Sequence, residues 1–292
     1  MGVELSPPTT SSMRLLAGRT AIITGAGRGI GLAAARAFGR EGAKVVVNDL
    51  DAAEAQAAVD VVTKDGGEAM AFAGSVTDPT LPEQLIQATV DAYGTPDIIV
   101  NNAGFLWDGV LHQMTDKQFE EIINCHLTAP FRLLRAAAPH IRAAAKLEIE
   151  HHGQPRDRSI VNVSSTSGLH GMAGQANYAS AKSGITGLTK TLAKEWGPLG
   201  VRANAVAFGM IDTRMTNAFS DTVKVDGEEV PQGLPDKVAN MWNKNPDMIK
   251  MIVPLARKGT AEEAAQGMLF LASPLSSYVT GHTLEVTGGF GI

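Results

Sequence analysis

Cysteine is nearly absent from this chain of 292 residues, in which Cys125 is the only one. A single cysteine cannot form an internal disulfide, so a disulfide-stapled extracellular scaffold is excluded. The composition is typical of proteins that work in a reducing compartment, and we therefore expect a cytoplasmic location.

The chain also lacks a positive charge excess and long apolar runs. Its formal net charge of −5 gives no electrostatic reason to expect nucleic acid or an anionic membrane surface as a partner. No apolar run approaches the ~18 residues that a membrane-spanning helix needs. The N-terminus has no basic stretch followed by an apolar core, as a secretory signal would. Residues 1–15 instead contain the polar, proline-bearing run VELSPPTTSS, which predicts a flexible tail.

Neither an internal repeat nor a shift in composition divides the rest of the chain, so 16–292 is expected to form a single domain. A metal site is not expected either. His151 and His152 lie in the charged stretch 147–158, but adjacent histidines point apart and no further ligands are near them in the sequence. We interpret 147–158 as a solvated loop.

Apolar β-branched runs alternate with helical patterns along the whole domain. This alternation predicts an α/β fold with one Rossmann-type, doubly wound, seven-stranded parallel sheet and helices on both faces. We expect strands at 20–24, 44–49, 68–72, 97–100, 159–163, 201–206 and 283–286, and helices at 29–41, 52–65, 80–93, 115–145, 175–196 and 260–272. Ligands bind beyond the carboxyl ends of such strands, where Gly25, Asp49, Asn102 and Ser165 are predicted to meet.

Residues 20–31, TAIITGAGRGIG, carry a short apolar run, a glycine-rich turn and the start of a helix. This order places backbone N–H groups at a helix N-terminus, where a pyrophosphate binds. Gly25, Gly29 and Gly31 allow a tight turn and close approach to phosphate. The spacing is Gly-x-x-x-Gly-x-Gly, which differs from the more common Gly-x-Gly-x-x-Gly, but the turn still predicts a dinucleotide site.

Asp49 at the end of the second strand bears on the choice of dinucleotide. A carboxylate at this place accepts hydrogen bonds from the adenosine ribose hydroxyls and repels a 2′-phosphate, which favours NAD(H). Arg28 beside the turn argues the other way, because a guanidinium pairs well with that phosphate. We give Asp49 more weight, and NADP(H) stays open as the alternative.

Tyr178 and Lys182 stand four residues apart in NYASAK, and Ser165 lies upstream in NVSSTSG. The spacing puts the phenol and the ammonium on one face of a helix. A positive charge beside a phenol lowers its pKa, which would prepare Tyr178 for proton transfer to or from a substrate oxygen. The serine hydroxyl could hold the same oxygen. The three residues predict chemistry at a carbonyl or an alcohol.

With these motifs, and with NNAG at 101–104 and NAVAFGMIDT at 204–213, the chain from about Leu16 onward resembles the short-chain dehydrogenase/reductase family. The resemblance implies a catalytic tetrad of Asn124, Ser165, Tyr178 and Lys182. In it Tyr178 is the acid/base, Ser165 polarises the substrate oxygen, Lys182 binds the nicotinamide ribose and Asn124 holds a water that relays protons. The cofactor contacts that it implies are Gly25, Arg28, Gly29, Ile30, Gly31, Asp49, Ser75, Val76, Asn102, Ala103, Gly104, Tyr178, Lys182, Gly209, Ile211 and Thr213.

Within that family the chain looks most like the 3-oxoacyl-thioester (3-oxoacyl-ACP) reductases. The resemblance therefore implies an oxidoreductase that interconverts a ketone and a secondary alcohol, with an acyl thioester as the candidate substrate, and it implies a homotetramer. A hydroxysteroid or other secondary-alcohol dehydrogenase is the alternative, and a non-catalytic NAD-sensing protein is a more distant one. The family places a substrate lid at about 214–250. There Met215, Phe219, Met241, Trp242 and Met248, with Met210 just before the lid, either line an apolar pocket or pack the lid against the body.

Overall fold

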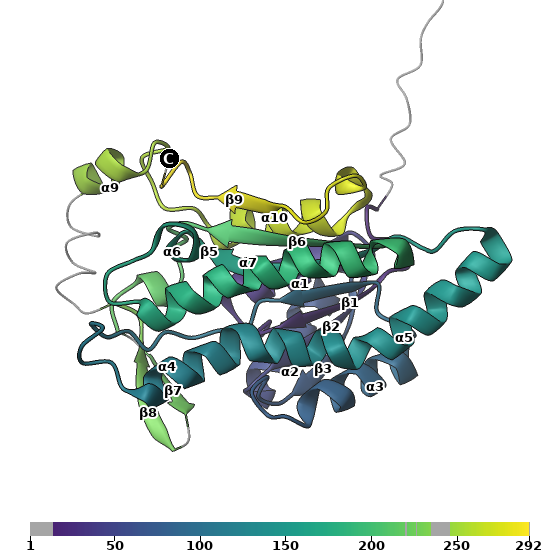
Figure 1. Cartoon of the computed structure of the whole chain (residues 1–292), viewed down its shortest axis with the longest axis horizontal. Coiled ribbons are helices and arrows are strands. Elements are labelled where there is room, and N and C mark those ends of the chain that lie inside the picture. Colours follow the sequence, from purple (N-terminus) through teal and green to yellow (C-terminus); the bar gives the residue numbers. More distant parts are fainter. Residues whose placement is uncertain (1–13, 220, 226, 235–245, 292) are drawn as a thin grey trace, which may run out of the picture.

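One parallel sheet organises the computed structural model, which describes residues 14–219, 221–225, 227–234 and 246–291 (Figure 1). Its strands are β1 (Thr20–Thr24), β2 (Lys44–Asp49), β3 (Glu68–Ala73), β4 (Ile98–Asn101), β5 (Arg158–Ser165), β6 (Val201–Phe208) and β9 (Thr283–Val286). They lie in the order β3-β2-β1-β4-β5-β6-β9, and every pairing is parallel. The predicted α/β fold with a seven-stranded parallel sheet is confirmed.

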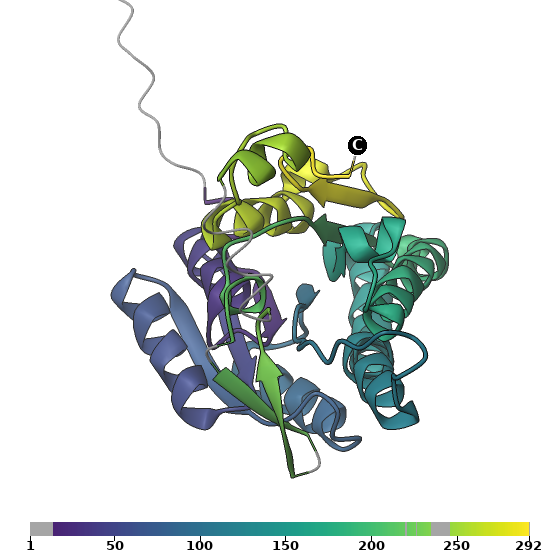
Figure 2. The same ribbon diagram turned by 90° about the vertical axis from the view of Figure 1, so that its left-hand side faces the viewer.

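Helices cover both faces of this sheet (Figure 2). They are α1 (Gly29–Arg40), α2 (Ala52–Lys64), α3 (Leu81–Tyr93), α4 (Asp116–Ile123), α5 (Ala129–His152), α6 (Thr166–His170), α7 (Ala176–Trp196), α9 (Pro246–Ile252) and α10 (Ala261–Ala272). Alternate residues of β1 point to opposite faces. Ala21 and Ile23 pack with α1, α2 and α10, whereas Ile22 packs with α3, α5 and α7. β1 is therefore buried on both sides, as its almost continuous apolar sequence requires.

The predicted helix at 115–145 differs from the observed one in two ways. It is interrupted by a π-helical segment, η1 (Asn124–Thr128), and its last part, α5, continues to His152. Gly153 ends α5 in the left-handed conformation at φ +77°. The prediction of a solvated loop for 147–158 is therefore wrong in its first half. Glu148 of α5 also pairs with Arg158 at 2.6 Å, which ties the helix end to β5.

The predicted lid contains regular structure that the sequence reading did not assign. β7 (Asp221–Val225) and β8 (Glu228–Gln232) form an antiparallel hairpin, which follows the short helix η3 (Arg214–Thr216). Met241 and Trp242 lie outside the described residues. So do residues 1–13 of the predicted tail, but Leu15 is placed, and its backbone N–H donates to Glu41 Oε2 at 2.8 Å.

No helix in the described part of the chain is long and apolar enough to cross a membrane. Across the same ranges, no group of three or more histidine, cysteine or acidic residues could hold a metal ion.

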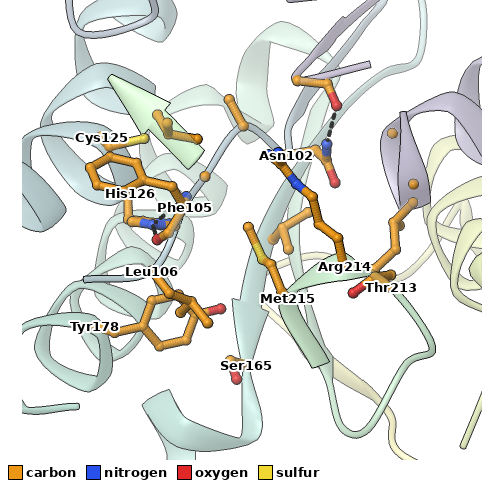
Figure 3. A pocket seen from close by; sticks show the side chains of 18 of the residues that line it. Asn102, Phe105, Leu106, Cys125, His126, Ser165, Tyr178, Thr213, Arg214 and Met215 are labelled. Atoms are coloured by element: carbon orange, nitrogen blue, oxygen red, sulfur yellow. Dashed lines mark hydrogen bonds between the residues drawn. The ribbon is translucent and has the colours of Figure 1, made fainter. Parts of the chain in front are cut away.

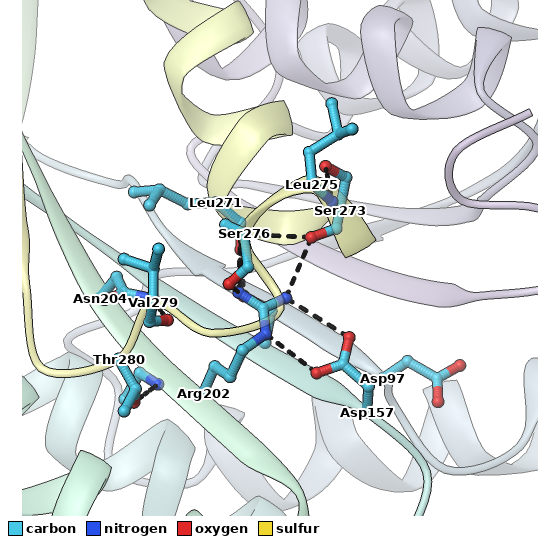
Figure 4. Close-up of polar contacts among 12 residues, drawn as sticks. Asp97, Asp157, Arg202, Asn204, Leu271, Ser273, Leu275, Ser276, Val279 and Thr280 are labelled. Atoms are coloured by element: carbon cyan, nitrogen blue, oxygen red, sulfur yellow. Dashed lines mark hydrogen bonds and ion pairs between the residues drawn. The ribbon is translucent and has the colours of Figure 1, made fainter.

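Arg202 in β6 is buried and connects three separate segments (Figure 4). Its guanidinium donates to Asp157 Oδ1 at 2.9 Å, to the Leu271 carbonyl at 2.9 Å and to Ser276 Oγ at 2.7 Å. It donates further to the Ser273 and Ser276 carbonyls. Arg202 thus helps to hold the end of α10 against the central sheet, together with Ser159 of β5, whose Oγ donates to the Leu271 carbonyl at 2.8 Å.

Replacing Arg202 with methionine is expected to lower the free energy of unfolding by about 3–5 kcal/mol, since it removes the ion pair with Asp157 and the hydrogen bonds that the guanidinium donates to buried carbonyl groups. Denaturant unfolding measures the change. Arg142→Met on the exposed surface of α5 is the matched control and should change stability by less than about 0.5 kcal/mol. An equal loss in both variants would contradict the structural role of Arg202.

Candidate active site

A single cavity of about 1560 Å³ brings the predicted residues together. It lies beyond the carboxyl ends of the strands, where the chain order reverses between β1 and β4. Every residue predicted for catalysis or cofactor contact lines it: Asn124, Ser165, Tyr178 and Lys182, with Gly25, Arg28, Gly29, Ile30, Gly31, Asp49, Ser75, Val76, Asn102, Ala103, Gly104, Gly209, Ile211 and Thr213.

The glycine turn between β1 and α1 is tight on its inner side. A Cβ on Gly31 would lie 2.2 Å from the Gly25 carbonyl oxygen and 2.6 Å from Asn102 Nδ2. Asn102 holds the turn by donating from Nδ2 to the carbonyls of Thr24 and Gly25 at 2.9 and 3.0 Å. On the outer side a Cβ on Gly29, at φ +56°, would meet no atom within 4 Å. The N-terminus of α1 therefore faces free space, and the turn fits a dinucleotide pyrophosphate.

Asp49 is fixed against this turn. Its Oδ2 accepts from the Gly27 N–H at 2.9 Å and its Oδ1 from the Asp51 N–H at 3.2 Å. Arg28, the residue that could attract a 2′-phosphate, is paired instead with Asp221 of β7 at 3.0 Å. Arg214 of η3 pairs with the same carboxylate. The guanidinium nearest to the turn therefore already has a carboxylate partner.

The acid/base group is assembled from β5 and α7 (Figure 3). The hydroxyl of Ser165, the last residue of β5, lies close enough to the Tyr178 phenol to favour its ionised form. Lys182 lies one turn further along α7, with its Nζ 5.5 Å from the centre of the Tyr178 ring. The lysine is 3% exposed and donates to the Val163 carbonyl at 2.7 Å. A substrate oxygen at Tyr178 and Ser165 would meet two hydroxyl groups.

Burial, rather than the lysine charge, dominates the proton affinities of this group. It raises the pKa of Tyr178 to about 12, although the hydroxyl of Ser165 acts in the opposite direction. Burial also lowers the pKa of Lys182 to about 8. The expectation that the neighbouring ammonium leaves Tyr178 with a lowered pKa is therefore wrong for the site without its ligands. Tyr178 is protonated here and can act as an acid.

Asn124 and His126 lie in the π-helical segment η1, and the structure orients them differently. Asn124 Oδ1 accepts from Arg132 of α5 at 3.3 Å. His126 instead stands edge-on to Tyr178, with ring centres 5.1 Å apart and planes at 81°. The sequence reading named Asn124 and missed His126. Of these two residues, His126 is the one with a described contact to Tyr178.

Other predicted residues line the rest of the cavity. Ser75 Oγ, after β3, shares a hydrogen bond of 2.7 Å with Thr77 Oγ1. Gly209 packs so closely on Thr287 that a Cβ there would lie 2.9 Å from Thr287 Cα. Among the predicted lid residues, Met210 and Met215 line the cavity, as does Met172, which the sequence reading did not name. Phe219 is 47% exposed and does not line it.

Comparison with known proteins identifies the family model and the proteins that this chain is similar to. Residues 19–224 match the family model described as short chain dehydrogenase, and 237–291 match that described as Enoyl-(Acyl carrier protein) reductase. The 3-oxoacyl-[acyl-carrier-protein] reductase of Chlamydia trachomatis is 37% identical over 94% of this chain and 98% of its own. The enzyme of that name in Vibrio cholerae is 38% identical over 94% and 98%, and that of Escherichia coli is 37% identical over 93% and 97%.

These matches span the glycine turn, the acid/base group and almost the whole sheet. The chain therefore belongs to the short-chain dehydrogenase family and is a nicotinamide-dependent oxidoreductase that acts on hydroxyl and keto groups.

Proposed function

We propose that the protein interconverts a 3-oxoacyl thioester and the corresponding 3-hydroxyacyl thioester, with NAD(H) as its cofactor. The observation that carries this proposal is the pair of hydroxyl groups of Tyr178 and Ser165, which lie in the same cavity as the glycine turn. The similarity to 3-oxoacyl-[acyl-carrier-protein] reductases supports the substrate class. The apolar lining by Met172, Met210 and Met215 suits an acyl chain, because methionine adapts its shape to flexible ligands.

In this proposal the keto oxygen accepts hydrogen bonds from Tyr178 and Ser165. A bound nicotinamide would supply or remove the hydride. As negative charge develops on the oxygen, Tyr178 gives up its proton, and the Ser165 hydroxyl stabilises the same atom. Lys182 holds the nicotinamide ribose and places its positive charge beside the phenol, which stabilises the phenolate that forms. The fourth member of the acid/base group is Asn124 or His126.

The preference for NAD(H) over NADP(H) rests on two carboxylates. Asp49 lies against the glycine turn, where it would accept from the adenosine ribose and repel a phosphate. Asp221 forms an ion pair with the guanidinium of Arg28. Gly25, Ser75, Val76 and Asn102 line the part of the cavity that would hold the adenosine end, and Gly209, Ile211 and Thr213 line the part that would hold the nicotinamide.

The test is a parallel fluorescence titration with NADH and NADPH, followed by turnover on acetoacetyl-CoA. We expect tighter binding of NADH, and we expect Asp49→Ser to shift the ratio of the two dissociation constants toward NADPH by about tenfold or more, since it removes a like charge. Asp60→Ser on the exposed face of α2 is the matched control. NADPH preference in the unchanged protein would overturn the cofactor choice. NADH binding without thioester turnover would overturn the substrate and favour a steroid or another secondary alcohol.

The proposal includes a homotetramer in the cytoplasm. The family resemblance supports the assembly, and the unpaired, buried Cys125 agrees with a reducing compartment.

A further inference from the structure

His126 is a buried ring that the proposed reaction does not yet use. It is 3% exposed, lines the cavity and lies in the π-helical segment η1 between α4 and α5. Such π-helical turns inside α-helices are frequent at functional sites, because they redirect one side chain without ending the helix.

The hydrogen bonds of the ring define which nitrogen is available. His126 Nε2 lies 2.8 Å from the Phe105 carbonyl oxygen and 3.3 Å from the Phe105 backbone nitrogen. The contact with the oxygen is the shorter one, and two acceptors do not approach each other so closely, so Nε2 carries the proton and donates to the carbonyl. Burial, helped by the charge of Lys182, lowers the pKa of His126 well below 6.5 and keeps the ring neutral. Nδ1 is then a bare acceptor. It is buried and has no hydrogen-bond partner among the described residues.

Gly104 and Tyr178 fix the position of this nitrogen. A Cβ on Gly104 would lie 2.2 Å from His126 Cε1 and 2.9 Å from Nδ1, so the glycine is what leaves room for the ring. On the other side the ring stands edge-on to Tyr178. Leaving a buried acceptor unpaired costs about 1–3 kcal/mol, so a partner from outside the chain is expected at Nδ1.

The hydrogen bonds of the Lys182 ammonium indicate what that partner is. Among the described residues its ammonium has one hydrogen-bond acceptor, the Val163 carbonyl, although it carries three N–H groups. A water can accept from the ammonium and donate to a bare nitrogen at the same time, which would satisfy both groups.

We propose that His126, through Nδ1, anchors a water against Lys182 and so positions the route by which Tyr178 regains its proton from solvent. The inference rests on the proposed function. Each reduction places one proton on the substrate oxygen; Tyr178 supplies it, and one proton from solvent replaces it by way of this water and the Lys182 ammonium. No bond to His126 is made or broken. His126 is a positioning residue, and it takes the place that the sequence reading gave to Asn124.

The test compares His126→Phe, which keeps an aromatic ring but removes the acceptor, with His126→Asn, whose amide stands at the place of Nδ1 and restores one. We expect His126→Phe to lower kcat by about 10- to 100-fold while KM and the NADH dissociation constant change less than about threefold. His126→Asn should regain most of kcat. His151→Phe at the exposed end of α5 is the matched control and should behave as the unchanged protein.

Three outcomes would overturn the inference. Asn124→Ala could cost more kcat than His126→Phe, His126→Phe could be as active as the unchanged protein, or it could lose cofactor affinity and thermal stability together without rescue by asparagine. If the unchanged protein binds NADH but reduces no thioester, the proposed function fails separately. The imidazole ¹⁵N shifts of His126 then decide: a protonated Nε2 with a hydrogen-bonded Nδ1 supports the water anchor, and an Nδ1 without a hydrogen bond contradicts it.

Discussion

Tyr178→Phe is expected to lower turnover by about 10²–10⁴-fold, the range that a positioned general acid contributes. The phenol is the only hydroxyl lost, and the ring keeps its edge-on contact with His126. Because the tyrosine is protonated, with its pKa raised to about 12, it is the proton donor for reduction throughout the neutral range. The measurement is steady-state reduction of acetoacetyl-CoA together with NADH titration, and the NADH dissociation constant should change less than about threefold.

Tyr278→Phe is the matched control for this substitution, since Tyr278 is fully exposed. It should leave turnover and binding unchanged. A protein that only senses or binds NAD would show no defect in either variant. Equal turnover of Tyr178→Phe and the unchanged protein would therefore remove Tyr178 from the reaction.

The sequence predicted those parts of the site that depend on short-range order. Asp49 ends a strand, the glycine turn and Asn102 each follow directly after one, and strands of one parallel sheet present their carboxyl ends at one edge. Once the alternation of strands and helices is recognised, these residues must meet. Tyr178 and Lys182 share one helical turn, so their proximity also follows from local geometry.

The fourth residue of the acid/base group, beside Tyr178, Ser165 and Lys182, could not be predicted in this way. Asn124 and His126 are two residues apart, so on a helix they point about 200° away from each other and only one can face Tyr178. Which one does so depends on the π-helical segment and on the space beside Gly104. The pKa values of Tyr178 and Lys182 depend on burial, which the tertiary structure sets.

The β7–β8 hairpin, in contrast, had a local signal that the sequence reading overlooked. The pair Asp226–Gly227 stands between the alternating runs DTVKV and EEVPQ, and this pattern is typical of a two-residue hairpin turn. The family resemblance led to its interpretation as a lid, and no strands were assigned within it. The pairing of Asp221 with Arg28, far away in the sequence, had no such signal.

Lys182→Met is expected to lower turnover by about 10²–10³-fold, because the phenolate that forms at Tyr178 loses the neighbouring charge. The methionine is similar in length, so the packing around α7 should persist. Lys190→Met on the exposed side of the same helix is the matched control. Unchanged turnover in Lys182→Met would mean that the ammonium neither supports the phenolate nor replaces its proton.

The same substitution is expected to change how stability depends on pH. Burial lowers the folded-state pKa of Lys182 from 10.5 to about 8, so between these values the unfolded chain binds more protons than the folded one. The lysine therefore makes the protein gain stability as pH rises through this window, and below pH 8 it carries a constant penalty of up to about 3 kcal/mol. Lys182→Met removes that penalty and also the hydrogen bond to Val163, so its stability relative to the unchanged protein should be highest below pH 8 and fall toward pH 10.5. Urea unfolding of both proteins across this range measures the difference. A difference that stays constant with pH would show that Lys182 is not a desolvated charge, and it would remove the electrostatic basis for its role beside Tyr178.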